Sequence, residues 1–148
     1  METVATPVSL ARLRQRLLER SMHVLEDEEG DLGLFLFPHF FYLISEPEKP
    51  ILGTSIFHRG VDVQHARACA NFVENFNRNY YLPKLFTVVS DQGKITFRVS
   101  HCFSWGANAT DQQLDAELDT FVRSALECFA ALEQYLADPW VNPSGESQ

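Results

Sequence analysis

Two side chains in the middle of the chain, His65 and Cys69, have the residue types and spacing of a metal site. They are four residues apart, so on a helix they share one face, one turn from each other. Imidazole nitrogens and thiolates are the ligands that zinc prefers, and His58, His101 or Cys102 could add a third ligand. This pattern indicates a small-molecule or metal-dependent enzyme built on His58, His65 and Cys69.

The rest of the sequence weighs against such an enzyme. It contains no CxxC pair, no glycine-rich phosphate loop, no nucleophile in a strand-to-helix elbow and no paired carboxylates on apolar segments. His101 and Cys102 are neighbours in a predicted strand, so they point to opposite faces. The acidic run Glu26–Asp31 lacks the alternating oxygen ligands of a calcium loop and is expected to keep a hairpin soluble. We therefore expect a protein that is not an enzyme and needs neither a metal nor a cofactor.

A row of three asparagines, Asn71, Asn75 and Asn79, is a second candidate site. Their four-residue spacing places the amides in line on one helix face, where they could hydrogen-bond an extended peptide or a polar ligand. The other interpretation is a solvated helix face, with the nearby Asn77 as a local cap before the chain turns at Pro83. The spacing alone leaves both interpretations open.

Length and charge limit the classes of partner. With 148 residues and 45% hydrophobic composition, the chain is expected to be one domain spanning residues 1–148, with frayed tails at 1–7 and 141–148. A net charge of -8 argues against a nucleic acid or an anionic membrane as partner.

Cysteine usage and hydropathy indicate a compartment. Three cysteines at wide spacing are typical of reduced thiols, and the first twenty residues have no uninterrupted apolar segment that could direct export. The longest apolar stretch, Leu32–Ser45, is too short to cross a bilayer and is interrupted by Pro38. We therefore expect a cytoplasmic protein without a membrane span.

Periodicity predicts an α+β fold in which helices pack on a single antiparallel sheet. Three helices are expected: one from the N-cap Ser9 to Arg20, one from the N-cap Asp62 to before Pro83, and one from Thr110 to before Pro139. The predicted strands have short connections, which join antiparallel neighbours. These strands are Met22–Glu26, Leu32–Leu36, His39–Ser45, Ile51–Phe57, Leu85–Ser90 and Lys94–His101.

Two local signals fix element boundaries. Thr110 and Gln113 have the spacing of a capping box, so the last helix is expected to begin there. Gly93, in the turn between the last two strands, can take the positive φ that a tight hairpin needs. The resulting order is α-β-β-β(β)-α-β-β-α.

This order, together with several short motifs, resembles the YbjN domain family of bacteria, whose members are described as sensory transduction regulators. The resemblance covers nearly the whole chain and depends on the order and spacing of four motifs. They are the acidic turn Asp27–Gly33, Asn77 followed by Pro83 and Lys84, the hairpin turn Asp91–Lys94, and the opening of the last helix from Gly106 through Thr110 to Leu114.

The chain is most similar to the actinobacterial branch, in which the fourth strand ends in an aromatic residue and an arginine, as Phe57 and Arg59 do here. It departs from the family at Phe35, where a tryptophan is usual, and at the following Pro38 and His39. The resemblance implies the fold of type III secretion chaperones. It further implies a small acidic homodimer that holds a segment of another protein.

An excess of apolar residues independently indicates a partner. The run from Phe40 to Ile44 is apolar at every position, so in a strand both faces are apolar, whereas one layer of helices covers only one face. The uncovered face is expected to bind a second copy or a protein client. The alternative is a monomer in which the first helix crosses that face. The residues expected at the interface or peptide-binding site are Phe40, Tyr42, Phe57, Phe72, Asn75 and Tyr80.

Overall fold

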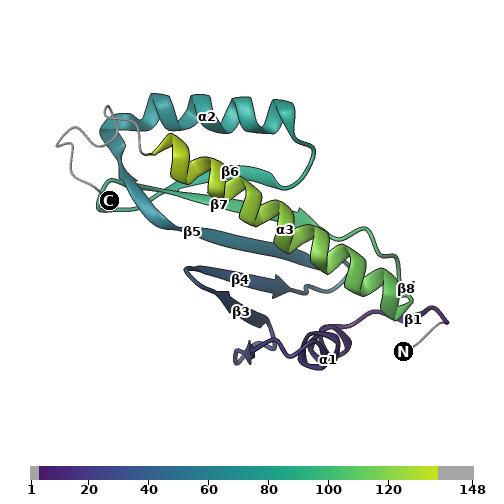
Figure 1. Ribbon diagram of the computed structural model, residues 1–148. Helices are drawn as coiled ribbons and strands as arrows, with labels where there is room; N and C mark the ends of the chain where they lie inside the picture. Colours follow the sequence, from purple (N-terminus) through teal and green to yellow (C-terminus); the bar gives the residue numbers. More distant parts are fainter. Residues whose placement is uncertain (1–3, 137–148) are drawn as a thin grey trace.

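Six strands form one antiparallel sheet, and the helices cover one of its faces (Figure 1). The computed structural model describes residues 4–136. In spatial order the strands are β2 (Val24–Glu26), β3 (Leu32–Leu36), β4 (His39–Ile44), β5 (Leu52–Asp62), β7 (Lys94–Cys102) and β6 (Lys84–Val89). Every neighbouring pair is antiparallel, so the predicted α+β class with one main antiparallel sheet is confirmed.

Three helices complete the predicted order of elements. They are α1 (Leu10–Glu19), α2 (Ala66–Asn79) and α3 (Asp111–Tyr135), and the 3-10 turn η1 (Val63–His65) precedes α2. Two short strands, β1 (Thr6–Pro7) and β8 (Asn108–Ala109), pair with each other at the start of α3. Thr6 and Pro7 are therefore ordered, in contrast to the frayed tail expected for residues 1–7. The tail expected at 141–148 lies outside the described residues.

The capping signals hold, and one strand runs further than expected. Ser9 accepts a hydrogen bond from the amide of Arg12, and Thr110 forms a complete capping box with Gln113. Gly93 has a φ of +75° in the hairpin turn. β5 continues past its predicted end to Asp62, because a register shift between Ile56 and Gly60 takes up extra residues without ending the pairing with β7.

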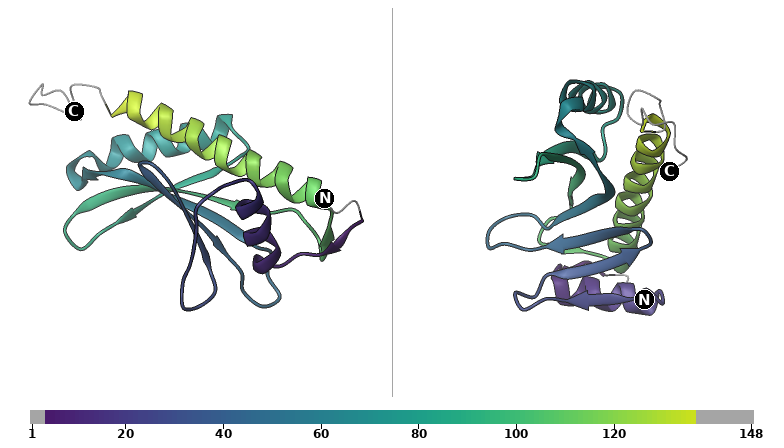
Figure 2. Two further views of the ribbon diagram at one scale, coloured as in Figure 1. Left: turned by 60° about the horizontal axis from the view of Figure 1, so that its bottom comes forward. Right: turned by 90° about the vertical axis from the view of Figure 1, so that its left-hand side faces the viewer.

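The core lies between one face of the sheet and the helices. In the left view of Figure 2, α2 and α3 both lie above the sheet. Large side chains of β4, β5 and β7 pack there against the phenyl rings of α3, and all are at most 1% exposed: Phe41, Phe57, Phe97, Phe121 and Phe129. Gly53 allows the close approach of α3, because a Cβ at this position would lie 2.7 Å from the ring of Phe121.

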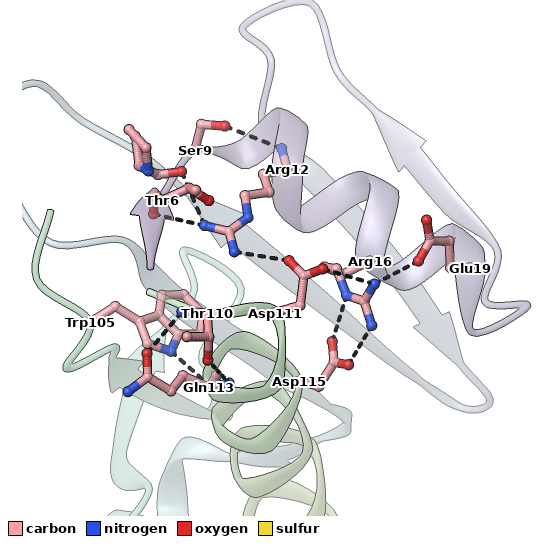
Figure 3. Close-up of polar contacts among 11 residues, drawn as sticks. Thr6, Ser9, Arg12, Arg16, Glu19, Trp105, Thr110, Asp111, Gln113 and Asp115 are labelled. Carbon is pink, nitrogen blue, oxygen red and sulfur yellow. Dashed lines mark hydrogen bonds and ion pairs between the residues drawn. The ribbon is translucent and has the colours of Figure 1, made fainter. Parts of the chain in front are cut away.

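A ladder of ion pairs fixes α1 beside the first half of α3 (Figure 3). Three arginines four residues apart, two in α1 and one at its C-cap, each pair with the aspartate 99 positions later, and Figure 3 shows the first two of these pairs. The pairs are Arg12–Asp111 at 2.9 Å, Arg16–Asp115 at 2.6 Å, and Arg20–Asp119. With Leu13 and Leu17 buried below them, these contacts hold α1 on the same side of the sheet as α3. The alternative placement of the first helix across the other face is therefore wrong.

Candidate protein-binding surface

The face of the sheet turned away from the helices carries a continuous set of large side chains. The strand register aligns five of them in one row across β3, β4, β5, β7 and β6: Phe35, Phe40, Ile56, Arg98 and Phe86. Together with the neighbouring rows they form a surface that we call the open face. Its residues are Leu25, Phe35, Phe40, Tyr42, Ile44, Leu52, Ile56, Phe86, Val88, Arg98 and Cys102.

The exposure of these side chains shows that no helix of residues 4–136 covers the open face. Leu25 is 52% exposed, Phe35 44% and Phe40 41%. Their neighbours on the opposite face, Leu34 and Phe41, are buried at 2% and 0%. Adjacent residues of β3 and β4 thus alternate between a covered and an uncovered apolar side.

Aromatic rings form a ridge at the β3–β4 end of the open face. The ring centroid of Phe40 is 4.7 Å from that of Phe35 and 6.0 Å from that of Tyr42. Phe37, in the turn between β3 and β4, extends the ridge with its ring 6.1 Å from Phe35 and is 86% exposed. An exposed group of aromatic rings of this kind is typical of a surface that contacts a partner.

A hollow lies at the opposite end of the open face, beside the loop between β4 and β5. It has a volume of about 280 Å³ and is mainly apolar. Ile44, Leu52 and Cys102 line it from the strands, and the Lys49–Glu46 ion pair stands at its rim. A hollow of this size has room for one apolar side chain of a partner.

The six residues predicted for an interface do not lie on one surface. Phe40 and Tyr42 are on the open face, whereas Asn75 is exposed on α2 and Tyr80 is exposed directly after it. Phe57 was wrongly expected at a surface: it is 1% exposed and packs against Phe129 of α3, because odd-numbered positions at this end of β5 face the helices.

Phe72 also belongs to the helical side of the sheet. Its ring lies 6.3 Å from that of Phe97 and 4.7 Å from that of Tyr135, so it joins α2 to β7 and α3. Conversely, the list from the sequence omits Phe35, Ile56, Phe86 and Arg98. Alternation along Lys94–Cys102, where Ile95, Phe97 and Val99 are apolar and the even positions are polar, could have placed Arg98 on the open face.

Comparison with known proteins identifies the family. A family model named YbjN, described as "Putative bacterial sensory transduction regulator", matches residues 9–134. The chain belongs to the YbjN family. A solved structure titled "Crystal structure of YbjN, a putative transcription regulator from E. coli" covers 89% of this chain and 96% of its own, with a TM-score of 0.75 and 16% identity. That likeness confirms the fold. No protein in the curated set matches the chain.

The residues of the alternative enzyme do not form a site in this YbjN-family chain. His58 pairs with Glu133 of α3, and Cys69 is buried at 2% exposure, which raises the pKa of its thiol. Across residues 4–136, no group of three or more His, Cys, Asp or Glu side chains is arranged to hold a metal ion. The geometry gives the alternative enzyme no support.

One polar cluster, formed by buried His101, partly buried Glu117 and exposed Ser104, lies at the contact between β7 and α3. The carboxylate of Glu117 accepts hydrogen bonds from the amide and hydroxyl of Ser104 at 2.7 and 2.6 Å, and lies 3.1 Å from Nε2 of His101. Burial raises the pKa of Glu117, but the hydrogen bonds from Ser104 and His101 outweigh it, so the pKa is below its ordinary value of 4.5. Because the serine donates to the carboxylate and not to the imidazole, the cluster joins β7 to α3 and lacks the geometry of a nucleophile activated by a base.

The asparagine row is exposed, and two of its three members contact each other. The amide of Asn79 donates to the backbone and side-chain oxygens of Asn75, at 2.9 and 3.2 Å. Asn77 exchanges two hydrogen bonds with the backbone of Leu85, so it fixes the start of β6 and does not cap α2 as expected.

Within residues 4–136, no helix has the length and hydropathy of a membrane span.

Proposed function

We propose that this YbjN-family protein is a non-enzymatic protein-binding module that acts in signalling by holding another polypeptide on the open face. The observation that supports this best is the contrast between the two sides of β4. Phe41 is fully covered by the protein's own helices, whereas Phe40 lies in an apolar row with Phe35 and Ile56 that faces outward. Soluble proteins rarely leave a contiguous apolar surface of this kind without a binding role.

Burial of the apolar open face would favour binding. Burial of apolar surface contributes about 25 cal/mol per Å², so hiding a few hundred Å² stabilises a complex by several kcal/mol before association costs are subtracted. The apolar surface is also preformed, since the open face belongs to a six-stranded sheet. Binding therefore requires little ordering of this protein.

Self-association is the second candidate for the same surface. A homodimer that pairs the open faces of two copies would also bury Phe35 and Phe40, in keeping with the dimer expected from the sequence. A chaperone-like hold on a client and residence in the cytoplasm complete the proposal. The reduced thiols Cys69, Cys102 and Cys128 are compatible with that compartment.

The exposed thiol of Cys102 provides a test that needs no mutation, because it lies on the open face beside Ile44 and Leu52. We would measure its alkylation by N-ethylmaleimide in cells that express the protein and in the purified protein at low concentration. We expect slower alkylation in cells, where a partner covers the face. Equal rates would contradict the proposal.

A matched variant controls for the cellular environment. Phe40→Asp places a charge in the apolar row and should abolish binding, so its Cys102 should react at the same rate in cells and in dilute solution. The mass of the purified protein at tens of micromolar then separates a second copy from a different partner.

A further inference from the structure

Arg98 occupies an unusual position in the open face. It lies near the middle of β7, and the strand register places Ile56 on one side of it and Phe86 on the other. Phe40 and Phe35 continue the same row. The guanidinium group of Arg98 therefore lies in a row whose other side chains are apolar, on the surface that a partner would cover.

The guanidinium of Arg98 lacks an acceptor for one of its buried donors. Its Nε is buried and has no hydrogen-bond partner among residues 4–136, while the residue as a whole is only half-buried. An arginine carries five N–H donors and remains charged in proteins. When a partner covers the face, every donor loses access to water, and an unpaired buried charge then costs several kcal/mol. A partner must therefore bring an acceptor to this point.

The charge of the open face differs from that of the whole protein. The net charge is -8, but the strand register places Lys84, Lys94 and Arg98 on the same side of the sheet as the open face, against one strand carboxylate, Asp62. The Lys49–Glu46 ion pair beside the hollow adds one charge of each sign. The acidic side chains of residues 27–31 and 46–48 lie in turns at the ends of the strands. Locally, the surface attracts an anion.

These observations decide between the two candidate occupants. A second copy would bring the same three cations. Its strand carboxylate on this face, Asp62, lies at the end of β5 and accepts a hydrogen bond from the amide of Gln64, and Glu46 beside the hollow already pairs with Lys49. Pairing two open faces would thus leave two arginines buried without carboxylates. A different protein that supplies an acidic side chain avoids this cost.

We propose that the open face binds a segment of another protein in which an Asp or Glu lies between apolar residues, and that its carboxylate pairs with Arg98. This inference rests on the proposed function. The carboxylate accepts two parallel hydrogen bonds from the guanidinium, and the flanking apolar side chains cover Phe40 and Phe86. The pair supplies specificity, and the apolar row supplies most of the binding energy.

The hollow near Cys102 sets a second requirement on the segment. Cys102 is four residues along β7 from Arg98, which is about 13 Å at 3.3 Å per residue. The bound segment therefore carries a large apolar side chain about 13 Å from its carboxylate, and this side chain enters the hollow lined by Ile44 and Leu52. In an extended segment this spacing corresponds to roughly four residues.

The experiment is a selection from a phage-displayed library of random 12-residue peptides on the purified full-length protein. We expect enriched peptides that contain an Asp or Glu flanked by apolar residues. A selected peptide is then synthesised with a fluorescent label, and its affinity is measured by fluorescence polarisation. Arg98→Met should weaken binding at least 10-fold, and so should replacement of the acidic residue of the peptide by its amide.

The combination of the two changes separates a direct pair from a general charge effect. If the carboxylate contacts Arg98, the variant and the amide peptide together should bind no more weakly than either change alone. Arg98→Lys keeps the charge but loses the planar fork and should restore only part of the affinity. Arg123→Met, on the exposed side of α3, is the matched control and should leave affinity unchanged. Urea unfolding verifies that each variant is folded.

The possible results separate this inference from the proposed function. Peptides that bind without an acidic residue, and equally well to Arg98→Met, would overturn the role of Arg98 and leave the binding function intact. Peptides that bind without slowing the alkylation of Cys102 would show that the site lies elsewhere. A dimer in which Cys102 is protected would make a second copy the occupant. Failure to select any peptide, with Cys102 equally reactive in cells and in solution, would overturn both.

Discussion

Neighbouring phenylalanines on opposite sides of β4 give the sharpest test of the two-sided sheet. Phe41 is 0% exposed, and its ring packs edge-on against Phe121 at 5.6 Å. Replacement of a buried phenylalanine by alanine typically costs about 3–5 kcal/mol, because the cavity adds to the lost burial. We expect Phe41→Ala to lower the free energy of unfolding by that amount.

The expected cost at Phe40 is smaller because the open face leaves 41% of the residue exposed. Full burial of such a side chain contributes about 1.5–3 kcal/mol, so the covered part, a little over half, is worth about 1–2 kcal/mol. Its contacts are the rings of Phe35 and Tyr42, which can close over part of the space. We therefore expect Phe40→Ala to cost less than half as much as Phe41→Ala.

Urea unfolding followed by circular dichroism measures both values under one set of conditions. Peptide binding should show the opposite order: Phe40→Ala weakens it, while the milder core variant Phe41→Leu, which keeps the protein folded, leaves it unchanged. Equal losses of stability at the two positions would show that both faces of β4 are core. That result would refute the reasoning.

Three further predictions concern the parts of the fold that support the open face. Gly53→Ala should lower the free energy of unfolding by about 1–3 kcal/mol, because its Cβ would meet a phenyl ring of α3. Gly60→Ala is the control: its Cβ meets nothing closer than 3.6 Å, so the free energy of unfolding should change little. Because the pKa of Glu117 is lower in the folded state, its ionised carboxylate stabilises the protein above pH 4.5, and this contribution is lost as the pH falls through the folded pKa. The unfolding free energy, measured from pH 3 to 6, should therefore depend less on pH in Glu117→Gln than in the unmodified protein. Identical pH profiles for the two proteins would contradict this. In the native purified protein, exposed Cys102 should react with a maleimide while Cys128 does not, because burial raises the pKa of Cys128 to about 12. Mass spectrometry of the alkylated peptides measures both reactions. Labelling of Cys128 before unfolding would contradict this prediction.

Local chemistry in the sequence predicts much of the fold. The Ser9 cap, the Thr110–Gln113 capping box and the Gly93 turn all occur where their side chains and spacing indicate. These signals depend on hydrogen bonds between residues three or four apart, so they need no knowledge of the rest of the chain. Short connections account for the neighbours from β2 to β5 and for the β6–β7 hairpin, and β3 has its predicted bounds, Leu32–Leu36. The pairing of β5 with β7 joins strands that are separated by α2 and β6, so short connections do not explain it.

The composition of the surface is harder to predict, because it depends on which face of each strand the helices cover. The run Phe40–Ile44 indicates two apolar faces but does not show that even positions are the uncovered ones. Phe57 was misplaced for that reason, since it lies beside the register shift in β5 and contacts α3. Arg98 was missed because its apolar neighbours Ile56 and Phe86 belong to other strands.

Photo-crosslinking from the open face tests the central claim most directly. A benzophenone amino acid replaces Phe40 in one variant and, as a control, Leu126 on the exposed side of α3 in another, and both are irradiated in cells. We predict that position 40 forms a covalent adduct of defined mass with another polypeptide and that position 126 does not. Adducts from position 126 alone, or no adduct from position 40, would contradict a binding role for the open face.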